Sequence, residues 1–152
     1  MERFIYDLII PNLEATTKEE VIKTLSSKLA ECGYVSKDYF QLVMEREKEY
    51  PTGLVANGAY IAIPHAFDKK IKGTHVAIGT LKNPVKFYNM ENLDEEIPVE
   101  IVFLLAINEA KEQLEMLKML MSIFKSKDLL KEIKNEKSRE VICNKLNGFL
   151  SE

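Results

Sequence analysis

The chain has 152 residues, of which 46% are hydrophobic and 30% charged, and a formal net charge of −3. These values are typical of a soluble globular protein with a substantial core, so we expect a single domain over residues 1–152. The pI near 5.6 leaves no basic footprint for nucleic acid, and the longest apolar run, 101–107, is far shorter than the ~20 residues of a membrane-spanning helix.

The N-terminal segment predicts a strand followed by a helix. Residues 4–10 combine aromatic and branched side chains and stop at Pro11, which indicates a strand. Thr17 and Glu20 have the spacing of a capping box, and the apolar residues after them recur at helical intervals. Gly33 is typical of a residue that closes such a helix.

The next segment predicts a second helix and then a buried strand that ends at a histidine. The helix is expected to begin at Ser36 and to end in the turn 51–53. The apolar run 61–63 indicates a strand, and Pro64 cannot donate a further ladder bond. His65 should therefore lie just past the carboxyl end of a strand, where open α/β sheets place their ligands.

The second half of the chain predicts three strands followed by helices. A polar loop at 68–73 separates His65 from these elements. The expected strands cover 74–81, 85–87 and 99–107, a long helix is capped by Asn108, and two shorter helices begin near Asp128 and Ser138. Strands and helices alternate imperfectly, so we expect an α/β fold in which a mixed sheet is flanked by helices.

His65 and Arg46 are the main candidates for chemistry. A neutral imidazole can act as a nucleophile near neutral pH, although a histidine at a strand end can also simply bond a carbonyl. A guanidinium can clamp phosphate oxygens, although Arg46 can also be a solvent-facing helix residue. His65 and His75 as metal ligands are a minority interpretation because no third ligand has a recognisable spacing, so we expect no metal.

Other motifs are absent from the sequence. It has no glycine-rich loop that would cradle a nucleotide phosphate and no GxSxG motif. Cys32 and Cys143 lie far apart, outside any CxxC or zinc spacing. The N-terminus lacks the basic and apolar regions of a signal peptide. We therefore expect a cytoplasmic protein.

Three motifs together resemble a known family. They are Arg46 with Glu47, the run Tyr50 to Leu54, and the run Ala62 to His65. They are similar to the Enzyme IIA signature of the bacterial sugar phosphotransferase system, in its fructose/mannitol type and best in its galactitol-like branch. The similarity extends over nearly the whole chain. The implied fold is a mixed sheet flanked by helices, as the element order also predicts.

The resemblance implies a phosphoryl relay. His65 would accept a phosphoryl group, expected on Nε2, from the histidine-containing phosphocarrier protein and pass it to Enzyme IIB. Uptake of the sugar would occur through the membrane Enzyme IIC, and no cofactor would be needed. Arg46 corresponds to the family arginine beside the active site. The surface around His65 is a candidate docking face, although we interpret its Phe67 first as core packing.

The sequence departs from the mannitol type at one position of the site. Mannitol-type members carry a second histidine near the start of the long helix, where this chain has Lys111 and Gln113. Either side chain is a candidate to meet the phosphoryl group, as are Glu47 and Thr52 from the matched motifs. A regulatory phosphoacceptor of the same fold, signalling to protein partners, is the alternative function.

Overall fold

Two long antiparallel strands form the centre of the fold. They are β5 (His75–Tyr88) and β6 (Glu96–Ile107) in the computed structural model, which describes residues 3–151. The other strands of the sheet are β1 (Ile9–Leu13), β2 (Gly53–Ala56), β3 (Ala59–Ala62) and β4 (His65–Phe67). β1 is parallel to β5, β3 and β4 are parallel to β6, and β2 is antiparallel to β3. The expected mixed sheet is confirmed.

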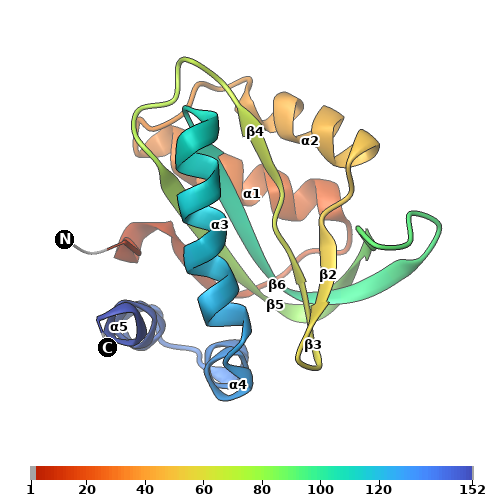
Figure 1. Cartoon of the computed structure of the whole chain (residues 1–152), viewed down its shortest axis with the longest axis vertical. Coiled ribbons are helices and arrows are strands. Elements are labelled where there is room, and N and C mark those ends of the chain that lie inside the picture. The colour runs from red at the N-terminus through yellow and green to blue at the C-terminus, as the bar shows by residue number, and fades with distance from the viewer. Residues whose placement is uncertain (1–2, 152) are drawn as a thin grey trace.

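Helices cover both faces of the sheet (Figure 1). One face carries α1 (Lys18–Glu31) and α2 (Tyr39–Glu49), and the other carries α3 (Ala110–Phe124), α4 (Lys127–Asn135) and α5 (Arg139–Leu150). Along β6, Val102 and Leu104 pack on the α1 and α2 side, whereas Phe103 and Leu105 pack on the other. A strand buried on both faces needs apolar side chains at every position, which explains the continuous apolar run.

The first strand begins later than the sequence predicts. Within the expected 4–10 strand, Tyr6–Leu8 form a 3-10 helix, and β1 then continues through Pro11. β1 is an edge strand with a register shift next to Asn12, whose φ is 54°. A proline is tolerated at such an edge or bulge because its missing N–H breaks no ladder bond there.

The predicted strands 74–81 and 85–87 are one strand. β5 runs through Asn83 and Pro84, which separate the two predicted strands, and shifts its register against β6 between Thr80 and Val85. The shift lets the strand absorb extra residues, including the proline, without losing its partner. The proline therefore marks a bulge here, not a turn.

Of the three helix starts predicted at Thr17, Ser36 and Asn108, the structure confirms the first and shifts the other two. Thr17 accepts the N–H of Glu20 at the start of α1, as predicted. α2 is preceded by Asp38 and not by Ser36, whose hydroxyl bonds the Asp38 carboxylate. α3 is preceded by Glu109, because the Asn108 side chain donates to the carbonyl of Ile71 instead.

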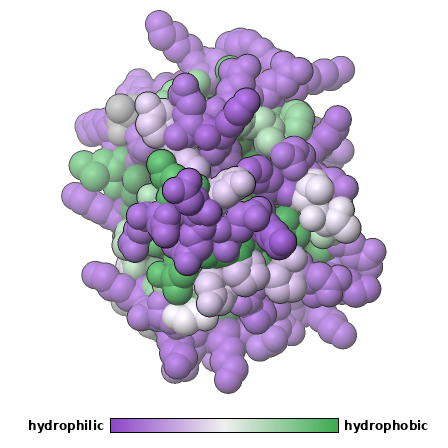
Figure 2. All heavy atoms as spheres, turned by 90° about the vertical axis from the view of Figure 1, so that its right-hand side faces the viewer, coloured by the Kyte–Doolittle hydropathy of each residue, from purple (hydrophilic) through white to green (hydrophobic). Residues whose placement is uncertain are grey.

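The large apolar side chains of α3 are only partly buried. Leu120 and Phe124 are buried, but Leu114 and Met121 are exposed. The face of the molecule seen in Figure 2 is mostly hydrophilic, with small separate hydrophobic patches. Among the described residues no helix is both long and apolar enough to cross a membrane.

Tyr39, the first residue of α2, ties this helix to the strand that begins at His65. The buried Tyr39 hydroxyl accepts the N–H of Ala66 at 3.2 Å and donates to the carbonyl of Leu105. These two main-chain groups face each other across the β4–β6 ladder. One side chain thus holds α2, β4 and β6 together next to the histidine.

Replacing Tyr39 by phenylalanine should lower the free energy of unfolding by about 1 kcal/mol, because buried main-chain groups lose a hydrogen-bond partner. Urea denaturation of the two chains measures the change. Tyr88→Phe, at an exposed ring, serves as the control and should leave the midpoint unchanged. Equal midpoints for Tyr39→Phe and the unaltered chain would show that the hydroxyl contributes nothing.

Candidate functional site

His65 lies where the sheet pairing is interrupted by a proline. β3 ends at Ala62 and β4 begins at His65, and both pair with β6 at the same offset, Ala62 opposite Val102 and His65 opposite Leu105. Pro64 has no N–H for the ladder, but its carbonyl still accepts the N–H of Leu105 at 3.0 Å. His65 thus follows the carboxyl end of β3, as expected, and is also the first residue of a new strand.

The His65 ring is held at both nitrogens. It is 8% exposed, its Nδ1 lies 2.9 Å from the carbonyl oxygen of Ile63, and its Nε2 lies 3.2 Å from the amide nitrogen of Gln113. A neutral ring with its proton on Nδ1 satisfies both contacts: Nδ1–H donates to Ile63, and the amide N–H donates to the lone pair of Nε2. The contacts therefore select the tautomer in which Nδ1 carries the proton and Nε2 carries the lone pair.

The surroundings also keep the ring uncharged. Burial lowers the pKa of His65, and the charge of Arg46 lowers it further, whereas the hydrogen bond to Ile63 raises it. The net direction is downward, so the ring is neutral at neutral pH and its Nε2 keeps a lone pair.

An NMR titration should find the midpoint of the His65 ring below the ordinary histidine value of ~6.5. Because the pKa of His65 is lowered on folding, neutral His65 contributes to the stability of the fold at pH values above the ordinary pKa of a histidine. This contribution is lost as the pH falls through the lowered pKa. The variant His75→Gln assigns the resonances of the two rings. A midpoint at or above the ordinary value would contradict the buried, neutral ring.

Arg46 lies in the last turn of α2 with its guanidinium between two aromatic rings. Its Cζ is 5.2 Å from the ring centroid of Tyr50 and 5.4 Å from that of Phe67. Its Nε is buried and has no hydrogen-bond partner among residues 3–151. Unpaired buried donors are uncommon, so this group is available for an anion. The structure brings Arg46 to His65, whose pKa its charge lowers.

Phe67 is not a core residue. It is 39% exposed, lies edge-on to the His65 ring with a centroid separation of 6.2 Å, and supports Arg46. The first interpretation of this residue as core packing is wrong. Together with Tyr50, it borders a hollow of about 750 Å³ beside the site, which Leu42 and Ala66 also line.

Glu47 and Thr52 lie behind the site and are buried, so neither is placed on its open surface. Thr52 donates its N–H and its hydroxyl to the two carboxylate oxygens of Glu47, at 2.9 and 2.8 Å. Burial raises the pKa of Glu47 to about 7, while these bonds and the charge of Lys18 lower it. Because the pKa of Glu47 is raised on folding, protonated Glu47 contributes to the stability of the fold at pH values below the ordinary pKa of a glutamate. This contribution is lost as the pH rises through about 7.

Of the remaining candidate residues, Gln113 contacts the His65 ring, whereas Lys111 and His75 have other surroundings. Gln113, half-buried on α3, contacts Nε2 of His65, whereas Lys111 is exposed. His75 stacks on Tyr34 with ring centroids 3.6 Å apart, and its Nε2 bonds the carbonyl of Lys72 at 2.7 Å. Across residues 3–151 no group of three or more His, Cys, Asp or Glu side chains is arranged to hold a metal ion.

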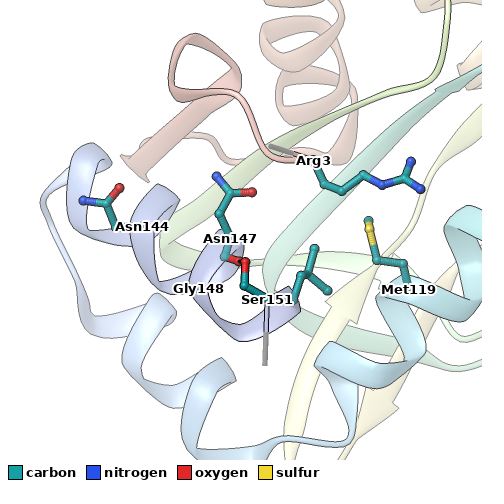
Figure 3. Close-up of a pocket in the computed structure, with 7 residues that line it drawn as sticks. Arg3, Met119, Asn144, Asn147, Gly148 and Ser151 are labelled. Carbon is teal, nitrogen blue, oxygen red and sulfur yellow. Dashed lines mark hydrogen bonds between the residues drawn. The ribbon is translucent and has the colours of Figure 1, made fainter. Parts of the chain in front are cut away.

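A second hollow, of about 620 Å³, lies beside α5 (Figure 3). Its lining residues include Arg3, Met119, Asn144 and Asn147. The Asn147 amide is already bonded to the main chain of Phe4, which it contacts twice at 3.0 Å. The labelled side chains contain one cation, Arg3, and one hydroxyl, that of Ser151, which donates to the Asn147 carbonyl at 3.0 Å. None of the labelled side chains is a general base that could activate this hydroxyl, so this hollow is a poorer candidate than the surroundings of His65.

The family of the chain follows from its match to a family model. Residues 4–148 match the model described as "Phosphoenolpyruvate-dependent sugar phosphotransferase system, EIIA 2". The chain belongs to this family. The resemblance seen in the motifs around Arg46 and His65 is thereby confirmed.

Individual relatives agree with this family. The transcriptional regulator ManR of Bacillus subtilis is 39% identical over 100 residues, which are 66% of this chain and 14% of ManR. The galactitol-specific EIIA component of Escherichia coli K12 is 25% identical over 116 residues, 76% of this chain and 77% of that protein. The chain spans 14%, 17% and 21% of ManR, the probable licABCH operon regulator and the fructose-specific EIIABC component of B. subtilis.

Solved structures share the fold. The complex of enzyme IIAMTL and phosphorylated enzyme IIBMTL from E. coli contains a chain that aligns with a TM-score of 0.79 at 22% identity, over 97% of this chain and 99% of that one. At this identity the likeness shows the fold alone. It confirms the expected mixed sheet flanked by helices.

Two features of the site were missed by sequence reasoning. One is the Tyr39 hydroxyl, which meets main-chain groups of β4 and β6. The other is the pair of rings around Arg46, of which Tyr50 stood within a matched motif but had no assigned role. The matched motif was the available signal for Tyr50, whereas nothing in the pattern around Tyr39 distinguishes it from an ordinary core residue.

Proposed function

We propose that this chain carries phosphoryl groups in a sugar phosphotransferase system and accepts them on Nε2 of His65. The observation that supports this most is the held, neutral ring: Nδ1 is tied to the Ile63 carbonyl, and Nε2 keeps its lone pair beside Arg46. Membership of the EIIA 2 family agrees with this role. The relay needs no cofactor, because the phosphoryl group arrives on another protein.

The transfer step exchanges one N–P bond for another. The lone pair of Nε2 forms a bond to phosphorus while the bond from phosphorus to the donor ring breaks, and that electron pair stays on the donor nitrogen. The proton on Nδ1 of His65 stays on Nδ1 and keeps its hydrogen bond to the Ile63 carbonyl, which also faces the positive charge that the ring acquires. Phosphoryl transfer depends mainly on positioning and charge stabilisation, which the remaining polar groups of the site supply.

Arg46 and Gln113 are the groups that would meet the transferred phosphoryl group. The guanidinium has an unpaired buried Nε and a fork of donors suited to phosphoryl oxygens. The Gln113 amide, which contacts Nε2 in the free protein, can donate to a phosphoryl oxygen once Nε2 is bonded to phosphorus. Lys111 adds exposed positive charge at the start of α3.

Membership of the EIIA 2 family supports three protein partners. The donor is a histidine-containing phosphocarrier protein, and the acceptor is an Enzyme IIB that works with a membrane Enzyme IIC. The solved complex of a mannitol IIA with its phosphorylated IIB supports a IIB partner for this fold. The galactitol-specific relative supports galactitol or a similar sugar alcohol as the transported compound. The relay takes place in the cytoplasm.

Reconstitution tests this function. The purified chain is mixed with phosphoenolpyruvate, Enzyme I and the phosphocarrier protein, and is expected to gain one acid-labile phosphoryl group. An added Enzyme IIB should then remove it. A chain that gains no label with an active donor system would overturn the proposal.

Regulation is the second candidate function, and the likeness to the transcriptional regulator ManR favours it. In that case His65 is still phosphorylated, but the phosphoryl group changes the binding of a protein partner. A label that stays on the chain in the presence of each Enzyme IIB encoded beside it would favour regulation over transport.

A further inference from the structure

A line of hydrogen bonds connects Glu47 at the end of α2 to the His65 ring. The Glu47 carboxylate accepts the N–H and the hydroxyl of Thr52. The Thr52 oxygen in turn accepts the N–H of Ile63 at 3.2 Å. The carbonyl of Ile63 is the group that faces Nδ1 of His65.

When Glu47 is ionised, above its pKa of about 7, the direction of each bond in this line is fixed by its neighbour. Because the Thr52 hydroxyl donates its only proton to Glu47, its oxygen lone pairs are left to accept the N–H of Ile63. That N–H also lies 3.4 Å from the Thr52 carbonyl, the longer of its two contacts. The longer contact continues the register of β2 and β3, which pairs Gly53 with Ala62. The peptide of Ile63 lies at the break where β3 ends and β4 begins.

We propose that Glu47 and Thr52 are positioning residues that set the tautomer of His65 by fixing the carbonyl of Ile63. The expected effect on the rate of phosphorylation rests on the proposed function of His65, whereas the expected effect on the tautomer does not. Glu47 is 3% and Thr52 is 5% exposed, so neither is placed to touch a partner or a phosphoryl group from the surface. Their effect reaches Nε2 through the orientation of Ile63, because a ring that donates from Nδ1 has its lone pair on Nε2.

The sheet alone holds this peptide by one long bond, from the Ile63 N–H to the Thr52 carbonyl at 3.4 Å. Pro64 interrupts the pairing with β6, and the Ile63 N–H turns to Thr52. Without the Thr52 hydroxyl, the Ile63 peptide keeps only the longer contact to a carbonyl. Its own carbonyl then has more freedom to turn away from Nδ1, and the ring proton is free to occupy either nitrogen.

The test compares Thr52→Val, which removes the hydroxyl at similar volume, with Thr52→Ser, which keeps it. Nitrogen NMR of the His65 ring reports the tautomer in each folded chain without any phosphoryl donor. Thr52→Val is expected to show a mixture of tautomers and phosphorylation slowed roughly 10- to 100-fold, as for other residues that orient a reacting group. Thr52→Ser should retain the Nδ1–H tautomer and the rate.

Thr80→Val is the matched control, because Thr80 is also a buried threonine whose oxygen accepts a main-chain N–H, that of Asn12. It should change stability but neither the tautomer nor the rate. Glu47→Gln, which can accept only one of the two Thr52 bonds, should shift the tautomer as Thr52→Val does, and it serves as the test if Thr52→Val does not fold.

An unchanged tautomer in folded Thr52→Val, or in Glu47→Gln where that variant takes its place, would overturn the inference. Failure of the unaltered chain to accept phosphate would instead overturn the proposed function. The NMR comparison would still decide the role of Glu47 and Thr52 in that case, so the two failures are distinguishable.

Discussion

A chain carrying His65→Ala is expected to accept no phosphoryl group from the phosphocarrier protein. The substitution removes the only ring nitrogen that the site holds neutral with a lone pair beside Arg46. No neighbouring group replaces it, because the Gln113 amide nitrogen is not basic. The measurement is the acid-labile label on the chain after incubation with the complete donor system.

His75→Ala is the matched control for this prediction. His75 is the other histidine of the chain, but it stacks on Tyr34 and bonds the Lys72 carbonyl. The control should label as the unaltered chain does. Because His65 is buried, circular dichroism of His65→Ala must first confirm that it is folded. A folded His65→Ala chain that still takes up label would place the phosphoryl group on another residue.

Replacing Arg46 by alanine should slow phosphoryl uptake by about 10²- to 10³-fold, the usual effect of removing one preorganised donor to a developing charge. The guanidinium is fixed between Tyr50 and Phe67 with an unpaired Nε, so little reorganisation is needed when the phosphoryl group arrives. Arg46→Lys keeps the charge but not the planar fork of donors. Its rate of phosphoryl uptake should lie between those of the unaltered chain and of Arg46→Ala. Rapid-quench measurements of the first turnover give these rates.

The control for Arg46 is Arg139→Ala. Arg139 also lies over an aromatic ring, that of Tyr6, at the start of α5. Removing it should leave the rate of phosphoryl uptake unchanged. If Arg46→Ala were as fast as Arg139→Ala, the half-buried Arg46 side chain would have a structural role and no part in the transfer.

The parts of the fold that were predicted correctly depend on local pattern. The apolar run in β6 is continuous because both faces of that strand are buried, and the cap at Thr17 is made by residues three apart. The errors at Pro11 and Pro84 have one cause. A proline excludes a ladder bond but does not show whether the chain turns or bulges, and β1 and β5 both bulge.

The candidate site was predictable only where motifs carry it. His65 and Arg46 were singled out by residue type and by the family signature. The line from Glu47 through Thr52 to Ile63 was not predictable in direction, because it depends on which donors the hairpin of β2 and β3 brings together. The Tyr39 hydroxyl likewise acts on β4 and β6, far from it in sequence.

Nε2 of His65 is the atom on which the proposed function depends, and the most direct measurement is to locate the phosphorus on the phosphorylated chain. The phosphorylated chain, labelled with nitrogen isotope in histidine, is examined by phosphorus and nitrogen NMR at alkaline pH, where phosphohistidine persists. The predicted result is a single phosphoryl group bonded to Nε2 of His65, with Nδ1 still protonated and bonded to Ile63. Phosphorus on Nδ1, or on His75, would contradict it.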